Sequence, residues 1–212
     1  MSTHILTSMF PTGFHDKFVE VLQQKINRRN KFAFIASEFE RIHEKTDYYF
    51  HFFLLMFAKA GIYFEETYVV DSRMSAEEAQ KRVAEADVIW LSGGDTPVQF
   101  QYLRKYGLDA VIKQHDGIVI GMSAGSINMA KTSICTLSCG HERLEIYNGL
   151  GCVDISVEPH FIRNEIINEV LELSETYTIY GLCDDSFIVC EDNSIQFYGE
   201  VYKLSDRKIE QI

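Results

Sequence analysis

Short apolar segments alternate with longer amphipathic segments along this chain, and this alternation constrains the fold more than any other feature. Strand-like runs are predicted at residues 4–7, 31–36, 63–70, 88–91, 117–120, 178–182, 186–189 and 195–198. Helical spacing of apolar residues predicts helices at 16–27, 47–60, 75–86 and 97–106. Strands that alternate with helices of this length form βαβ units. We therefore predict an α/β fold with a mostly parallel sheet and helices on both faces, a three-layer, flavodoxin-like arrangement.

The size and charge of the chain narrow the class of protein. Its 212 residues, 46% of them apolar, are enough to bury one core, so we predict a single domain over residues 1–212. The net charge of −11 argues against a nucleic acid or an anionic membrane as partner. The longest apolar stretch, 50–58, is too short to span a bilayer, and the first residues lack the pattern of a signal peptide. The odd number of cysteines favours a reduced, cytoplasmic chain.

The sequence Gly-Met-Ser-Ala-Gly at 121–125 follows the apolar run 117–120 and precedes a segment that can begin a helix. Strand, tight turn and helix in this order are the setting in which G-x-S-x-G forms a nucleophile elbow. Such a turn exposes the serine hydroxyl above the edge of the sheet, and its glycines leave room for neighbouring backbone. Ser123 is therefore a candidate nucleophile, and the amide of Ala124 is a candidate donor to an oxyanion.

A second glycine-containing turn, Ser-Gly-Gly-Asp-Thr-Pro at 92–97, follows the strand-like run 88–91. Because ligands bind at the carboxyl ends of the strands in such sheets, we expect both turns at the functional edge. The amide of Gly94 is a candidate for the second half of an oxyanion hole. The alternative is an ordinary turn in which Asp95 or Thr96 caps the next helix. Asp95 is also a candidate for contacting substrate.

A serine nucleophile needs a base, and His160 is the strongest candidate among the seven histidines. It lies in Glu-Pro-His-Phe at 158–161, after a short strand-like segment at 154–157. The proline restricts the backbone immediately before the imidazole. His141 is a second candidate for the base.

Together, these motifs resemble peptidase family S51, the group of dipeptidase E and cyanophycinase, which has a class I glutamine-amidotransferase-like fold. The resemblance depends on residues 91–96, 121–126 and 158–161 in this order, and on the 37-residue step from the serine to the histidine. It extends along the whole chain, from the first predicted strand to residues 181–185.

The resemblance implies a role for each of four residues. Ser123 would be the nucleophile, His160 the general base, and the amides of Gly94 and Ala124 the oxyanion donors. The implied activity is that of a serine-type peptidase that hydrolyses short peptides through an acyl-enzyme. No cofactor is implied.

The third member of the triad is where this sequence departs from the family. Dipeptidase E relatives carry an acid about fifteen residues after the nucleophile, and that position is Ser138 here. Glu158 is our first candidate, because in a strand its side chain would lie on the same face as that of His160. The other candidates are Glu142, Glu145, Asp184 and Asp185. A Ser–His dyad is a further alternative.

The family's substrate-binding arginine is also missing. Dipeptidase E relatives hold an N-terminal aspartate with an arginine, and the corresponding position lies near Ser174. Arg163, three residues after His160, is our candidate for gripping a substrate carboxylate bidentately. Its alternative role is an ion pair with Glu165 or Asp184. Selectivity for Asp-X dipeptides is therefore not predicted.

Three functional hypotheses follow from the sequence. The first is a peptidase acting on a small peptide substrate, with a homodimer left open. The second is a non-catalytic member of the same fold that binds a small molecule, and the third is an esterase or amidase on a non-peptide substrate. A metal site is not expected, because the spacing of Cys135, Cys139 and His141 fits no common zinc pattern.

Overall fold

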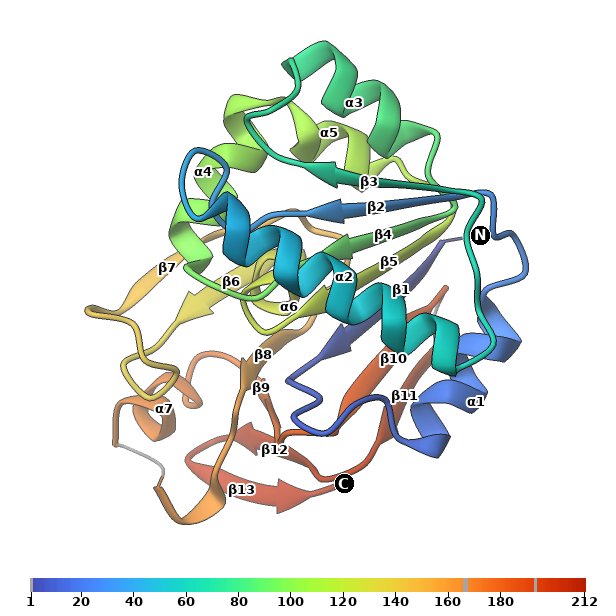
Figure 1. The fold of residues 1–212 in the computed structure, drawn as a ribbon. Helices are drawn as coiled ribbons and strands as arrows, with labels where there is room; N and C mark the ends of the chain where they lie inside the picture. Colours follow the sequence, from blue (N-terminus) through green and yellow to red (C-terminus); the bar gives the residue numbers. More distant parts are fainter. Residues whose placement is uncertain (1, 166–167, 193) are drawn as a thin grey trace.

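The computed structural model describes residues 2–165, 168–192 and 194–212 (Figure 1). The strands of the first half are β1 (Thr3–Thr7), β2 (Lys31–Ile35), β3 (Glu66–Val70), β4 (Val88–Leu91) and β5 (Ile118–Met122). Those of the second half are β6 (Thr132–Cys135), β7 (Glu145–Asn148), β8 (Ser156–Pro159), β9 (Ile179–Leu182), β10 (Phe187–Glu191), β11 (Ser194–Tyr198), β12 (Val201–Ser205) and β13 (Lys208–Gln211). The helices are α1 (Asp16–Lys25), α2 (His43–Lys59), α3 (Ala76–Ala84), α4 (Thr96–Lys105), α5 (Leu108–Lys113), α6 (Ala124–Met129), the 3₁₀ helix η1 (Arg163–Glu165) and α7 (Asn168–Leu173).

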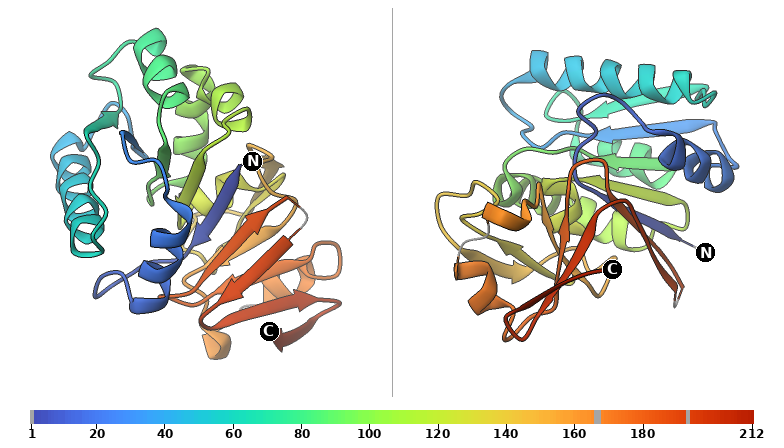
Figure 2. Two further views of the ribbon diagram at one scale, coloured as in Figure 1. Left: turned by 90° about the vertical axis from the view of Figure 1, so that its right-hand side faces the viewer. Right: turned by 90° about the horizontal axis from the view of Figure 1, so that it is seen from below.

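A seven-stranded sheet in the order β11-β10-β1-β5-β4-β2-β3 forms the centre of the molecule. The strands from β1 to β3 in this order are all parallel. At one edge, β10 pairs antiparallel with β1, and β11 pairs antiparallel with β10. Helices α1 and α2 cover one face of the sheet, and α3, α4, α5 and α6 cover the other (Figures 1 and 2). The predicted α/β fold with a mostly parallel sheet is confirmed.

The buried residues of the sheet form one hydrophobic cluster on each face. Along β2, Phe32 and Phe34 belong to the cluster under α1 and α2, while Ala33 and Ile35 belong to the cluster on the opposite face. This alternation follows from the period of two in a strand that is buried on both sides. Aromatic side chains fill the first cluster, in which Trp90 and Phe53 have ring centroids 4.4 Å apart.

A second sheet, in the order β13-β12-β9-β8, lies beside the carboxyl edge of the central sheet (Figures 1 and 2). The sequence analysis predicted β9 but not β12 and β13, and it placed β8 two residues too early. Strands β8 and β9 are parallel, with Pro159 opposite Leu182. The segments that follow these two strands therefore begin side by side.

In the described part of the chain, no helix combines the length and the apolar character that are needed to span a bilayer.

Candidate active site

Ser123 lies at a sharp turn between β5 and α6, as the elbow motif predicts. Its backbone has φ 51° and ψ −109°, a sparsely populated conformation for a residue with a side chain. The two flanking glycines make this turn sterically feasible. A Cβ on Gly121 would lie 2.6 Å from the amide nitrogen of Ser126, and one on Gly125 would lie 2.3 Å from the carbonyl oxygen of Leu91.

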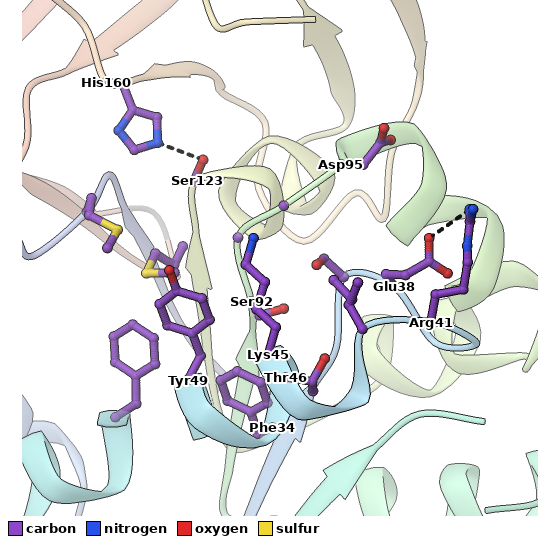
Figure 3. A pocket seen from close by; sticks show the side chains of 17 residues that line it. Phe34, Glu38, Arg41, Lys45, Thr46, Tyr49, Ser92, Asp95, Ser123 and His160 are labelled. Atoms are coloured by element: carbon purple, nitrogen blue, oxygen red, sulfur yellow. Dashed lines mark hydrogen bonds and ion pairs between the residues drawn. The ribbon is translucent and has the colours of Figure 1, made fainter. Parts of the chain in front are cut away.

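His160 directly follows β8 and reaches the serine from the second sheet (Figure 3). Its Nε2 is 2.9 Å from Oγ of Ser123, and its Nδ1 is 2.9 Å from Oδ1 of Asp184. Because a carboxylate can only accept, Nδ1 carries the proton in this arrangement, and Nε2 is left to accept the serine proton. The pairing of β8 with β9 explains the contact, since His160 and Asp184 come one and two residues after the paired ends Pro159 and Leu182. Serine, imidazole and carboxylate are therefore joined in one chain of hydrogen bonds.

The structure does not bring Glu158, our first candidate for the third member, to the histidine. Its Oε1 accepts hydrogen bonds from Thr136 Oγ1 at 2.6 Å and Ser138 Oγ at 2.5 Å. The expectation assumed that the strand continues to residue 160, but β8 ends at Pro159 and His160 has φ 56°. This left-handed conformation turns the imidazole away from the face on which Glu158 lies. Asp184, one of the alternatives, occupies the position beside Nδ1.

Glu158 is 1% exposed, and burial raises the pKa of its carboxyl group to about 7. Its Oε2 has no hydrogen-bond partner among the described residues. Asp185, the other strand-end candidate, has φ 64°, and its amide donates to the carbonyl of Met9 at 2.8 Å. His141, the second candidate for the base, contacts Thr96 Oγ1 at 3.3 Å instead of the serine. Among the predicted residues, the structure thus joins only Asp184 to the pair of Ser123 and His160.

Sequence analysis missed Ser8, which connects two parts of the site. Ser8 is fully buried directly after β1. Its Oγ donates to Asp184 Oδ1 at 2.7 Å and accepts from the backbone amide of His160 at 2.8 Å. One hydroxyl therefore holds both the carboxylate and the strained backbone of the histidine. The signal that could have found it is its place after a strand parallel to β5, at the edge where Ser123 lies.

The turn after β4 approaches the serine, because a Cβ on Gly93 would lie 3.4 Å from Ser123 Cβ. Gly94 has φ 150°, and a Cβ there would lie 2.2 Å from Ser37 Oγ, so only glycine fits. Asp95 caps α4, because its Oδ1 accepts the amide of Val98 at 2.9 Å. The amide of Ala124 opens α6, where the first amides have no acceptor within the helix.

A cavity of about 430 Å³ opens next to the serine (Figure 3). Ser123, His160, Gly94 and the predicted substrate residue Asp95 line it. Arg163, the other predicted substrate residue, lines a neighbouring hollow of about 590 Å³ together with His160 and Asp184. Its guanidinium carbon is 5.7 Å from the ring centroid of Tyr202. The imidazole therefore stands between two hollows.

The described residues contain no group of three or more histidine, cysteine, aspartate or glutamate side chains arranged to hold a metal ion.

Comparison with known proteins gives a family and a fold. The sequence model of peptidase family S51 matches residues 8–198. A crystal structure named as a peptidase E from Listeria monocytogenes EGD-e is similar with a TM-score of 0.67 and 20% sequence identity, covering 93% of this chain and 98% of that one. A peptidase from an acI-B1 actinobacterium has a TM-score of 0.72 at 17% identity, covering 100% of this chain and 94% of that one. No match was found among curated proteins.

Proposed function

Because this chain belongs to peptidase family S51, we propose that it is a serine-type peptidase that hydrolyses short peptides through an acyl-enzyme on Ser123. The observation that carries the proposal is the unbroken series of contacts from Ser123 Oγ through His160 to Asp184, with both heavy-atom distances at 2.9 Å. A nucleophile, a base in reach of it and a carboxylate that orients the base are the three parts that this chemistry needs.

In the first half of the reaction, Ser123 Oγ attacks the carbonyl carbon of the scissile bond and His160 Nε2 accepts the hydroxyl proton. Asp184 stabilises the imidazolium that forms and holds Nδ1 as a donor. The imidazolium then protonates the leaving amine, and the bond between the carbonyl carbon and the amine breaks. In the second half, His160 Nε2 accepts a proton from a water molecule as its oxygen attacks the acyl carbonyl carbon. The bond between that carbon and Oγ then breaks, His160 returns the proton to Ser123 Oγ, and the carboxylic acid product leaves.

We assign the amides of Gly94 and Ala124 to the developing oxyanion. The restricted space at Gly94 supports this assignment, because the turn is held against Ser37 and the amide is fixed before substrate arrives. A donor that is already in place stabilises the negative charge without reorganisation during the reaction. Removal of one such donor costs about 3 kcal/mol in the transition state of other serine hydrolases.

The hollow that contains Arg163 suggests why the substrates would be short. The leaving amine must lie near His160, which protonates it, and His160 borders both hollows. A leaving residue on this side could place its terminal carboxylate against the Arg163 guanidinium, which can bind a carboxylate with two parallel hydrogen bonds. We therefore propose Arg163 as the residue that recognises the carboxylate of the leaving group.

The alternative of a non-catalytic binding protein rested on the missing acid at Ser138. The contact between Asp184 and His160 removes that support, since another carboxylate occupies the place beside Nδ1. The alternative of an esterase or amidase differs only in the acyl group and leaving group.

Hydrolysis of matched substrates tests the proposal. Dipeptides, blocked tripeptides and short-chain p-nitrophenyl esters would be incubated with wild type and Ser123→Ala, and the products identified by mass spectrometry. We expect dipeptide cleavage by wild type and none by Ser123→Ala. Cleavage of the esters alone would replace the peptidase by an esterase. Equal dipeptide cleavage by both proteins would refute the role of Ser123.

A further inference from the structure

The cavity beside Ser123 has an apolar wall that the proposed reaction steps do not use. The half-buried Met9 and Tyr49 and the exposed Ile42 present carbon atoms to it. Phe34, Phe53 and Met122, which are 1%, 0% and 5% exposed, form the buried layer behind these side chains. In Figure 3, Phe34 and Tyr49 lie on the far side of the cavity from His160. A substrate group that binds against this wall loses its contacts with water and gains contacts with carbon atoms. This exchange is favourable for an apolar group and unfavourable for a polar one.

The direction of attack decides which part of a substrate enters this cavity. The reacting carbonyl carbon must lie between Ser123 Oγ and the amides of Gly94 and Ala124. The leaving amine must lie toward His160, because Nε2 protonates it. The side chain on the acyl half of the substrate then points away from the leaving amine, into the cavity that Gly94 and Ser123 line.

The charged residues around the cavity do not suit an acidic side chain. Arg41 is already paired with Glu38, at 3.3 Å between Nη2 and Oε2. Asp95 is acidic itself and caps α4. Lys45 is the remaining cation in the lining, and it has no carboxylate within salt-bridge distance among the described residues. Lys45 is exposed, so a carboxylate near the apolar wall would lose its hydration without gaining a buried partner.

We propose that this cavity binds the side chain of the residue whose carbonyl is attacked, and that it selects a bulky apolar side chain over a small or an acidic one. This inference rests on the proposed function and adds the substrate class to it. A cavity of about 430 Å³ is within the size range of small-molecule sites. Side chains such as those of leucine, methionine and phenylalanine match the apolar wall in chemistry.

Rates on four dipeptides with a common leaving residue, Ala-Gly, Leu-Gly, Phe-Gly and Asp-Gly, test the selectivity. Each buried methylene group contributes about fourfold to binding. We therefore expect kcat/KM for Leu-Gly and Phe-Gly to exceed that for Ala-Gly by roughly 10- to 100-fold. Asp-Gly should be the poorest of the four.

A variant that fills the cavity tests its location. Thr46 lines the cavity on α2 and is 6% exposed, so Thr46→Leu adds carbon inside it. We expect this change to lower the ratio of kcat/KM for Phe-Gly over Ala-Gly by at least about tenfold. Tyr48→Leu is the matched control, because Tyr48 is 64% exposed on the same helix and does not line the cavity. The substrate ratio is informative because a general loss of folded protein would lower both rates equally.

Three results would overturn the inference. An equal rate on all four dipeptides would show that the cavity does not select, and an unchanged ratio in Thr46→Leu would place selection elsewhere. A preference for Asp-Gly that is lost in Lys45→Gln would show an acidic specificity instead. Each of these leaves the peptidase proposal intact, since a dipeptide is still cleaved. Failure of the proposed function is a different result, namely no cleavage of any dipeptide together with a Ser123 that does not react with a fluorophosphonate.

Discussion

Replacing Asp184 by asparagine tests the assignment of the third member of the triad. The substitution removes a negative charge 2.9 Å from Nδ1 of His160 and keeps the size of the side chain. At this distance a unit charge stabilises an imidazolium by about 6 kcal/mol at an effective dielectric constant near 20, and by about 1.4 kcal/mol in bulk water. The side chains of His160 and Asp184 are 41% and 42% exposed, so the value lies between these limits. We expect kcat/KM to fall by about 100- to 1,000-fold, within the range from tenfold to 10⁴-fold that the two limits define.

The asparagine also disturbs the tautomer, because its amide can donate to Nδ1 and leave the proton on Nε2, where it blocks proton transfer from Ser123. The assay is the rate of dipeptide hydrolysis, together with the rate at which a fluorophosphonate reacts with Ser123. Asp185→Asn is the matched control, because Asp185 is adjacent but its backbone contacts are with Met9, whose carbonyl accepts its amide at 2.8 Å, and with His15, whose Nε2 donates to its carbonyl at 2.7 Å. A loss of less than threefold in Asp184→Asn, or an equal loss in the control, would refute the reasoning.

Three further predictions follow from the geometry. Gly94→Ala should lower kcat by about 100-fold or more, because its Cβ would meet Ser37 Oγ at 2.2 Å and displace an oxyanion donor; kcat near wild type would contradict this. Ser8→Ala removes a hydrogen bond to the Asp184 carboxylate and should slow fluorophosphonate labelling of Ser123 by about 10- to 100-fold. A change of less than twofold would show that the Ser8 hydroxyl does not help to position Asp184 and His160. Burial raises the pKa of the Glu158 carboxyl group to about 7 in the folded state, compared with 4.5 in the unfolded chain. The folded protein therefore favours the protonated carboxyl group, and this contribution to the free energy of unfolding is fully present below about pH 4.5 and is lost as the pH rises through 7. The gain in unfolding free energy from Glu158→Gln, measured by denaturant titration, should therefore grow by about 2 to 3 kcal/mol between pH 5 and pH 8; a gain independent of pH would contradict it.

The central sheet and the elbow could be predicted because their signals are local. Apolar runs bounded by polar residues indicate buried parallel strands, and the glycines of residues 121–125 are needed by the turn itself. The ends of two helices obey equally local rules: Ser75 caps α3 by accepting the amide of Glu78, and Gly61 after α2 has φ 72°.

The contact between His160 and Asp184 could not be singled out from the sequence because it depends on the second sheet. His160 and Asp184 are 24 residues apart, and they meet only because β8 and β9 pair in parallel. The sequence around Glu158 indicates a strand that continues to His160, which would put both side chains on one face. His160 instead has a left-handed backbone conformation, so its side chain does not share a face with that of Glu158. Proximity along the chain was a poor guide because one backbone dihedral decides the direction of the imidazole.

The position of Arg163 was equally beyond local reasoning. The sequence identified a cation three residues after His160, but only the fold places it in a hollow separate from the one that Asp95 lines. The apolar wall of the first cavity combines Phe34 from β2 with Phe53 from α2, which are 19 residues apart, so neither position indicated a binding site from the sequence.

The measurement that tests the central claim most directly is intact-mass analysis after reaction with a fluorophosphonate probe. Wild type, Ser123→Ala and His160→Ala would be compared after circular dichroism has shown that each is folded. We expect one adduct per wild-type chain, mapped by peptide sequencing to Ser123, and no adduct in either variant. A folded wild-type protein that gains no mass, or an adduct that persists in Ser123→Ala, would contradict the claim that Ser123 is an activated nucleophile.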